Sequence, residues 1–180
     1  MSERPAPSPL AIGRPARRKV AFPPSVDANT RVLILGSLPG DASIRQGEYH
    51  AHRGNAFWDL IGDLLGEPLR GEPYAVRLKR LRARGVGLWD VIESAERAGS
   101  LDSAIRGAEV RDLGAFLERL PALKAIGFNG RMAATHGRKQ LGARQGLALI
   151  DLPSSSGAHA GMSRAAKLAA WGALATYLAD

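Results

Sequence analysis

Three short polar stretches hold the residue types that could do chemistry, and each of them follows an apolar run. They are GSLPGD at 36–41, an Asn-Gly pair that begins at Asn129, and PSSSGAHAG at 153–161. Between the first two lies YHAHRGN, residues 49–55, which combines a phenol, two imidazoles and an amide. Amide groups can hold a water molecule in place, and glycine-rich turns expose backbone N–H donors. These stretches therefore suit a hydrolytic or ligand-binding site.

Several common chemistries are disfavoured by what these stretches lack. GSLPG has neither the lysine of a phosphate-binding loop nor the G-x-G-x-x-G pattern, which weakens a nucleotide-cofactor interpretation. His50 and His52 stand two residues apart, a spacing that seldom marks a metal-ligand pair. The serines lack a G-x-S-x-G elbow. The absence of cysteine excludes disulfides, thiolate zinc sites and a cysteine nucleophile. We therefore expect no metal and no cofactor.

Each candidate residue also has an ordinary structural interpretation, which stays open at this level. Gly36 and Gly40 suit a tight turn that follows a strand. Asn55 could cap a helix, and Asn129 could be a turn residue. The aromatic residues of the same region could belong to the core: Tyr49, Phe57 and Trp58.

Apolar periodicity indicates the elements that must position these residues. Continuous apolar runs predict strands buried on both faces at 31–35, 122–128 and 147–152, and a strand or turn at 86–92. Helical spacing predicts helices at about 55–65, 74–85, 110–120 and 129–141, and a final helix at 164–179 with Ser163 as its N-cap. Strands that alternate with helices predict an α/β fold with a parallel sheet and helices on both faces. Ligands bind at the carboxyl ends of such strands, where all three polar stretches lie.

Charge and composition narrow the class of protein. The 180 residues carry a formal net charge of +8, and 45% of them are hydrophobic. Residues 1–25 hold six prolines and several basic side chains, which predicts a flexible, basic N-terminal extension before one domain at 26–180. The excess of positive charge favours DNA or RNA as partner, with a merely solubilising role as the alternative. Without a long apolar run we expect no membrane association and a cytoplasmic location.

Taken together, the motifs resemble the uracil-DNA glycosylase superfamily, and most of all its hypoxanthine-DNA (deoxyinosine) glycosylase branch. The residues that carry the resemblance are LGSLPGDAS (35–43), YHAHRGNAFWDLI (49–61), AIGFNG (125–130) and LPSSSGAHAGMS (152–163). The similarity covers about residues 30–178. It implies a three-layer α/β/α fold with a central four-stranded parallel sheet, and a pocket for a flipped base at the strand ends.

The resemblance also implies roles for individual residues. The first motif lies under the flipped nucleotide, and the ring of Tyr49 stacks on the base. Asn55 positions the attacking water, and Asn129 reads the base edge. The second motif enters the minor groove of DNA. The implied pocket residues are Gly36, Ser37, Leu38, Pro39, Gly40, Tyr49 and Phe57, and the implied DNA-binding loop holds Ser154, Ser155, Ser156, Gly157 and His159. Three features depart from the family pattern: Leu38 replaces an Asp or Asn of other branches, Ser154 stands where other branches place His or Asn, and SGAHA replaces the SPANA frequent in this branch.

An amide is chemically suited to detect deamination. Hypoxanthine presents an O6 acceptor beside an N1–H donor, and uracil presents O4 beside N3–H in the same sense. Adenine and cytosine present the reverse pattern, and each mismatched buried group costs about 1–3 kcal/mol. We therefore predict a monofunctional DNA glycosylase for hypoxanthine, and possible further substrates are uracil and xanthine.

The expected enzyme is a monomer that acts on DNA containing deaminated bases, at the bacterial nucleoid in the cytoplasm. Three alternatives stay open. The protein could be a mainly uracil-specific glycosylase or a basic α/β nucleic-acid-binding protein with an inactive pocket. A nucleotide-binding Rossmann-type enzyme is the third, although it lacks its phosphate fingerprint.

Overall fold

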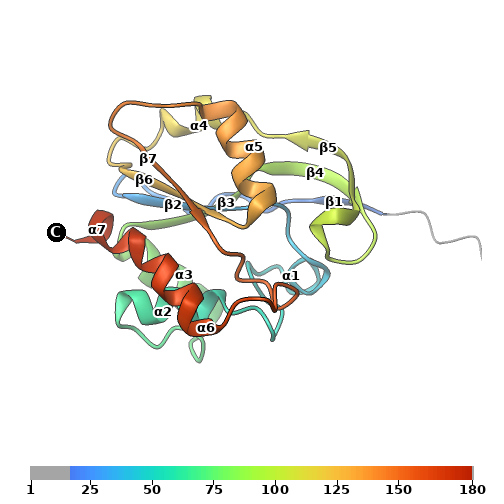
Figure 1. Ribbon diagram of the computed structural model, residues 1–180, viewed down its shortest axis with the longest axis horizontal. Helices are drawn as coiled ribbons and strands as arrows, with labels where there is room; N and C mark the ends of the chain where they lie inside the picture. Colours follow the sequence, from blue (N-terminus) through green and yellow to red (C-terminus); the bar gives the residue numbers. More distant parts are fainter. Residues whose placement is uncertain (1–16, 180) are drawn as a thin grey trace, which may run out of the picture.

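A computed structural model describes residues 17–179, and its centre is a four-stranded parallel sheet (Figure 1). The strands are β2 (Val32–Gly36), β3 (Val86–Asp90), β6 (Ala125–Asn129) and β7 (Ala148–Leu152), in the spatial order β3-β2-β6-β7. All three pairings are parallel. This confirms the predicted sheet, including the run at 86–92, whose first part is a strand.

Alternation along the central strand β2 explains why helices cover both faces of the sheet. Leu33 and Leu35 belong to one hydrophobic cluster, whereas Val32 and Ile34 belong to the other. Successive side chains of a strand point to opposite faces, so an apolar run of five residues must be covered twice.

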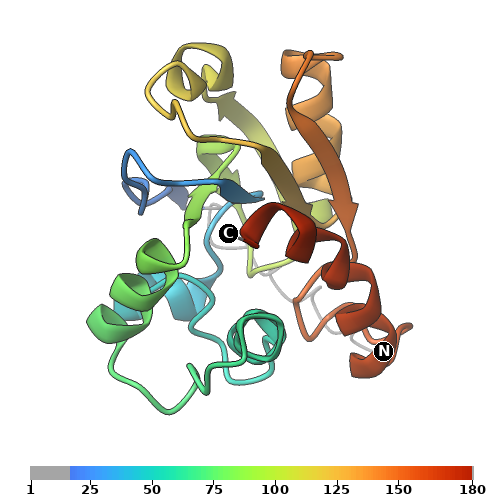
Figure 2. The same ribbon diagram turned by 90° about the vertical axis from the view of Figure 1, so that its left-hand side faces the viewer.

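The helices divide between the two faces accordingly, as Figures 1 and 2 show. One face carries α2 (Phe57–Leu65), α3 (Tyr74–Ala83) and α6 (Arg164–Trp171), and the other carries α4 (Leu113–Leu117) and α5 (Arg131–Leu141). The predicted three-layer α/β/α architecture is confirmed. No helix within residues 17–179 is long and apolar enough to cross a bilayer.

Two predicted helices are shorter than expected for identifiable reasons. Ser163 caps α6 as predicted, since its Oγ accepts a hydrogen bond from the Ala166 N–H at 3.2 Å. The helix ends at Trp171, and a 3-10 turn then leads into α7 (Ala175–Leu178). The helix predicted at 110–120 starts only at Leu113, because Asp112 accepts from the Ala115 N–H at 3.0 Å and so sets the N-terminus there.

A second, antiparallel sheet was not predicted. It contains β1 (Arg18–Val20), β4 (Ile92–Arg97) and β5 (Ile105–Val110) in the order β1-β4-β5, at the right of Figure 1. The short helix α1 (Asp41–Gln46) follows β2, and the 3-10 turn η1 (Asp102–Ala104) lies between β4 and β5. This sheet brings the β4–β5 connection beside the carboxyl ends of the parallel strands.

The predicted domain boundary at residue 25 needs correction. Arg18–Val20 pairs with β4, Ala21 is buried in a core cluster, and Ser25 forms an isolated bridge with Leu88. Residues 18–25 are thus part of the domain, because backbone pairing ties down a segment that its proline content alone would leave loose. The rest of the expected extension, residues 1–16, lies outside the described residues.

Candidate active site

A pocket of about 500 Å³ lies where the carboxyl ends of β2, β3 and β6 meet the loop after β7. The structure brings nearly all predicted site residues to its wall: 36–40, Tyr49, Asn55, Asn129, 154–157 and His159. Sequence reasoning did not predict the other wall residues that matter below, His50, Asp90 and the segment 100–103 of the second sheet. The volume is in the range of pockets for small molecules.

Asn55 is half-buried in the pocket wall and is held on two sides. Its Oδ1 accepts a hydrogen bond from the Phe57 N–H at 3.0 Å, at the start of α2. Its backbone carbonyl accepts from Arg70 Nη2 at 2.6 Å, and Arg70 is itself fixed by Asp59 at 2.7 Å. An amide oxygen has two lone pairs, so Oδ1 can support the helix and still hold a water molecule.

The aromatic residues are arranged differently from the prediction. Phe57 is fully buried behind the pocket wall, so the prediction that it lines the pocket is wrong. The ring of His50 lies on it instead, with centroids 3.9 Å apart and planes 19° from parallel. Tyr49 lines the pocket, but its ring packs edge-on against Phe22 and its hydroxyl donates to the Pro23 carbonyl at 3.0 Å. The imidazole of His50 is therefore a ring of the pocket wall that is stacked on Phe57.

His50 is unusual in both backbone and charge. Its φ of 55° makes it the non-glycine residue with a left-handed backbone in the part of the chain that the structure describes. Burial lowers the pKa of its imidazole to about 3, so the ring is neutral at physiological pH. A neutral ring between Phe57 and the pocket is an apolar surface that a planar base could contact.

Both polar atoms of the Asn129 side chain bond to the second motif. Its Nδ2 donates to Ser155 Oγ at 2.9 Å, and its Oδ1 accepts from the Ser155 N–H at 2.8 Å. The Ser155 carbonyl in turn accepts from the Ala56 N–H at 2.8 Å. Gly157 packs so closely that an added Cβ would lie 2.7 Å from the Gly54 carbonyl oxygen. Asn129 thus links β6 to the second-motif loop, and that loop to the start of α2.

The first motif is held by the second sheet. Arg97 of β4 is buried, and its guanidinium donates to the Leu38 carbonyl at 3.1 Å and to the Pro39 carbonyl. Ser37 donates to Asp102 at 2.7 Å. Two carbonyls and one hydroxyl of the turn are therefore fixed from outside the parallel sheet. A buried arginine within a short strand gives no sequence signal that could have predicted this.

Asp90 ends β3 directly opposite Gly36 in the parallel register. A Cβ on Gly36 would lie 2.5 Å from Asp90 Oδ1, so any larger residue there would have to displace the Asp90 carboxyl. Asp90 is 4% exposed, and burial raises the pKa of its carboxyl to about 7 although Arg111 and Arg97 lower it. The sequence signal was present but overlooked: one acid ends an apolar run at the expected strand terminus.

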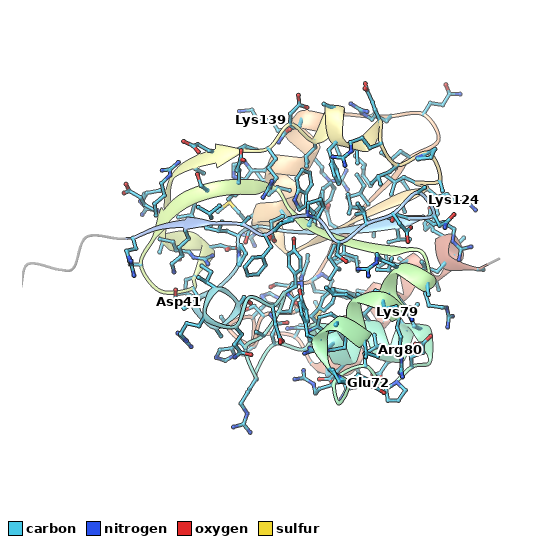
Figure 3. The ribbon with its side chains drawn as sticks, turned by 180° about the vertical axis from the view of Figure 1, so that it is seen from behind. Asp41, Glu72, Lys79, Arg80, Lys124 and Lys139 are labelled. Carbon is cyan, nitrogen blue, oxygen red and sulfur yellow. The ribbon has the colours of Figure 1, made fainter. Side chains whose placement is uncertain are left out.

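Much of the positive charge near the helical layer is neutralised locally. On α3, Arg80 pairs with Glu72 at 2.9 Å, and Arg77 pairs with Glu48 at 3.0 Å. Arg80 and Glu72 are labelled in Figure 3. By contrast, His159 of the pocket wall and Arg53, which lies in sequence between the wall residues His52 and Asn55, are exposed. Within residues 17–179 no three His, Cys, Asp or Glu side chains come together as a metal site.

Comparison with known proteins agrees with this geometry. The Uracil DNA glycosylase superfamily profile matches residues 23–175. The chain is 43% identical over 146 residues to the hypoxanthine DNA glycosylase of Methanosarcina acetivorans, which covers 81% of this chain and 91% of that protein. It is 40% identical over 142 residues to the hypoxanthine DNA glycosylase of Methanosarcina barkeri, with 79% and 89% covered.

A solved structure shares the fold as well. The solution NMR structure of a candidate uracil DNA glycosylase from Methanosarcina acetivorans superimposes with a TM-score of 0.80 and 41% identity, over 90% of this chain and 99% of that one. Sequence, fold and the arrangement of the motifs around one pocket lead to the same conclusion: this chain belongs to the uracil DNA glycosylase superfamily.

Proposed function

We propose that this protein, a DNA glycosylase, excises hypoxanthine from DNA by attack of water at C1′ of the deoxyribose. The observation that carries the proposal is that Asn55, the first motif and the second motif surround one pocket at the strand ends. The names of the two curated relatives support hypoxanthine as the base. Uracil is the competing substrate, since it presents the same donor and acceptor edge. The relative solved by NMR is also described as a candidate uracil DNA glycosylase.

The base must leave the helical stack before the pocket can take it. The C1′–N9 bond then breaks with oxocarbenium character, and its electron pair passes to the base. A water held by Asn55 Oδ1 forms the new bond to C1′ and loses a proton, which the departing base takes up. Asn55 has no relevant pKa, so its contribution is to position the water and not to deprotonate it.

The remaining task is to stabilise the negative charge on the leaving base. The turn at 36–40 is fixed by Arg97 and Asp102, so any N–H groups that it presents are already oriented when the base arrives. Preorganised donors of this kind require no rearrangement at the moment of reaction. His50 would supply a flat, neutral surface for the base, stacked in turn on Phe57.

The second-motif loop is the candidate DNA contact. Its inner residue Ser155 is 1% exposed, whereas Gly157 and His159 at its tip are exposed. The loop is therefore anchored at its base and free at its tip, as expected of a segment that contacts the DNA backbone. We propose that the protein acts as a monomer without metal or cofactor.

The test is single-turnover cleavage of oligonucleotides that each carry one deoxyinosine, deoxyuridine or deoxyxanthosine, with abasic sites detected by alkaline strand breakage. We expect deoxyinosine to be cut fastest. Faster cleavage of deoxyuridine would mean that uracil, and not hypoxanthine, is the preferred base. If the protein binds all the duplexes but forms no abasic product, it is a nucleic-acid-binding protein with an inactive pocket.

A further inference from the structure

The carboxyl group of Asp90 is a buried acid at the pocket that the proposed mechanism does not use. It lines the pocket beside Gly36, yet it is 4% exposed. Its Oδ2 makes no hydrogen bond to any residue of the range 17–179. A buried carboxyl oxygen without a partner is rare, because leaving it unpaired is costly. Because Asp90 belongs to the pocket wall, a ligand that enters the pocket would come close to this carboxyl group.

The charged groups around Asp90 come from several elements. Arg111 precedes α4 and Arg97 lies on β4, and both guanidiniums act on the carboxyl through space. Their hydrogen bonds go elsewhere: Arg97 donates to the first motif, and Arg111 donates to the Phe22 carbonyl at 3.2 Å. Asp102 adds a like charge from η1. The phenols of Tyr49 and Tyr74 also face the charge of Asp90 from the helical side.

These opposing influences place the carboxyl near the midpoint of its titration at neutral pH, so that protonated and ionised forms are both populated. Burial raises its pKa most, the two guanidiniums lower it, and the result is a pKa of about 7. A protonated carboxyl offers one donor and one acceptor side by side, whereas an ionised one offers acceptors alone. Proteins use neutral buried carboxylic acids as hydrogen-bond donors in this way.

We propose that Asp90, as a protonated carboxylic acid, contacts the edge of the flipped base, donating to O6 and accepting from N1–H of hypoxanthine. This inference rests on the proposed function. It assigns to Asp90 the recognition that sequence reasoning gave to Asn129, whose Nδ2 and Oδ1 both bond to Ser155. Asp90 and the first motif would then meet the base from adjacent strands, β3 and β2.

The protonated form also suits the chemistry. As the C1′–N9 bond breaks, negative charge spreads over the base and reaches O6, and an O–H donor there stabilises it. An ionised carboxylate would place a negative charge beside O6 and oppose the reaction. Cleavage should therefore be fastest when Asp90 holds its proton and should slow as that proton is lost.

The test compares the pH profiles of the wild type, Asp90→Asn and Asp90→Ala in single-turnover cleavage of deoxyinosine. The asparagine keeps a donor and an acceptor at every pH, so it is the matched rescue variant. For a group that titrates at about 7, the wild-type rate should fall roughly 30-fold between about pH 6 and about pH 8.5. Asp90→Asn should be active and nearly flat over that range, and Asp90→Ala should be slow throughout. Glu118→Gln, which removes an exposed carboxylate outside the pocket wall, should leave the wild-type profile unchanged.

Binding provides a readout that does not depend on turnover. A duplex with 2′-fluoro-deoxyinosine resists bond cleavage, so its affinity relative to an undamaged duplex reports recognition alone. The wild-type preference should be lost at high pH and kept by Asp90→Asn. If the wild type cuts nothing yet shows this pattern, the proposed reaction fails and the edge contact stands. A folded Asp90→Asn protein that is as slow and as unselective as Asp90→Ala, or a wild-type rate that rises through pH 7, would overturn the inference.

Discussion

The link between Asn129 and Ser155 gives a sharp test of what Asn129 does. Asn129→Ala removes two hydrogen bonds of 2.9 and 2.8 Å and leaves the N–H and Oγ of Ser155 without partners in a buried setting. At about 1–3 kcal/mol for each unsatisfied group, partly relieved by water, we expect a loss of about 2–4 kcal/mol. For a domain of this size that lowers the melting temperature by roughly 5–15 °C.

Asn129→Asp separates anchoring from base recognition. A carboxylate can accept from both the N–H and the O–H of Ser155, so both bonds persist once the hydroxyl turns. If Asn129 anchors the loop, this variant should melt close to the wild type and cut deoxyinosine within about tenfold of its rate. If Asn129 instead reads the base edge, the variant loses its donor to O6, and the rate should fall roughly 30- to 1000-fold.

The two assays are a thermal melt and single-turnover cleavage, measured for both variants and for Ser155→Ala. Because Ser155→Ala removes only the hydroxyl side of the link, it should lose about half as much stability as Asn129→Ala. A well-folded, inactive Asn129→Asp protein would refute the anchoring argument. It would also restore Asn129 as the base-reading residue.

Three further predictions follow from the site. Asn55→Ala should slow single-turnover cleavage at least ~100-fold through loss of the positioned water. Asn55→Ser keeps an oxygen that can cap α2, so a wild-type cleavage rate in the serine variant would mean that Asn55 is only a helix cap. Gly36→Ala should be destabilising in a thermal melt because its methyl group would lie 2.5 Å from Asp90 Oδ1. Wild-type stability would mean that the Asp90 carboxyl moves aside at little cost. Asp90 holds its proton to about pH 7 when folded but only to about 3.8 when unfolded, so the folded state binds more protons between these values and stability falls as pH rises through them. The full effect on the free energy of unfolding is about 4 kcal/mol. Asp90→Asn should therefore unfold at a higher denaturant concentration than the wild type near pH 8 but not near pH 4. The same difference in midpoint at both pH values would contradict this prediction.

The strands of the central sheet and the polar segments at their ends were predictable because they depend on local pattern. A run such as residues 32–36 is apolar at every position, which only a strand covered on both faces requires. Ser163 could likewise be predicted as a cap, since its partner lies three residues away. The convergence of the motifs then followed from the rule that parallel strands share one carboxyl edge.

The second sheet could not be predicted, because its strands are stabilised by distant partners. Arg18–Val20 pairs with residues 94–96, and nothing in a proline-rich segment indicates a partner so far along the chain. Because the second sheet was not predicted, the role of Arg97 was not predicted either. Arg97 donates to the Leu38 carbonyl, which is 59 residues away in the sequence.

The sequence by itself determined which residues arrive at the site, and the tertiary structure decided what each of them can do there. Local periodicity reports the burial of one face of an element, so it placed Asn129 and the two motifs at strand ends and Asn55 at the start of a helix. It does not report the partner of a side chain. Asn129 bonds to Ser155, 26 residues away, and Asp90 remains without a partner for Oδ2 although two guanidiniums lie near. Hydrogen bonding and charge at a site depend on distances between segments remote in sequence, and only the packed structure fixes those distances.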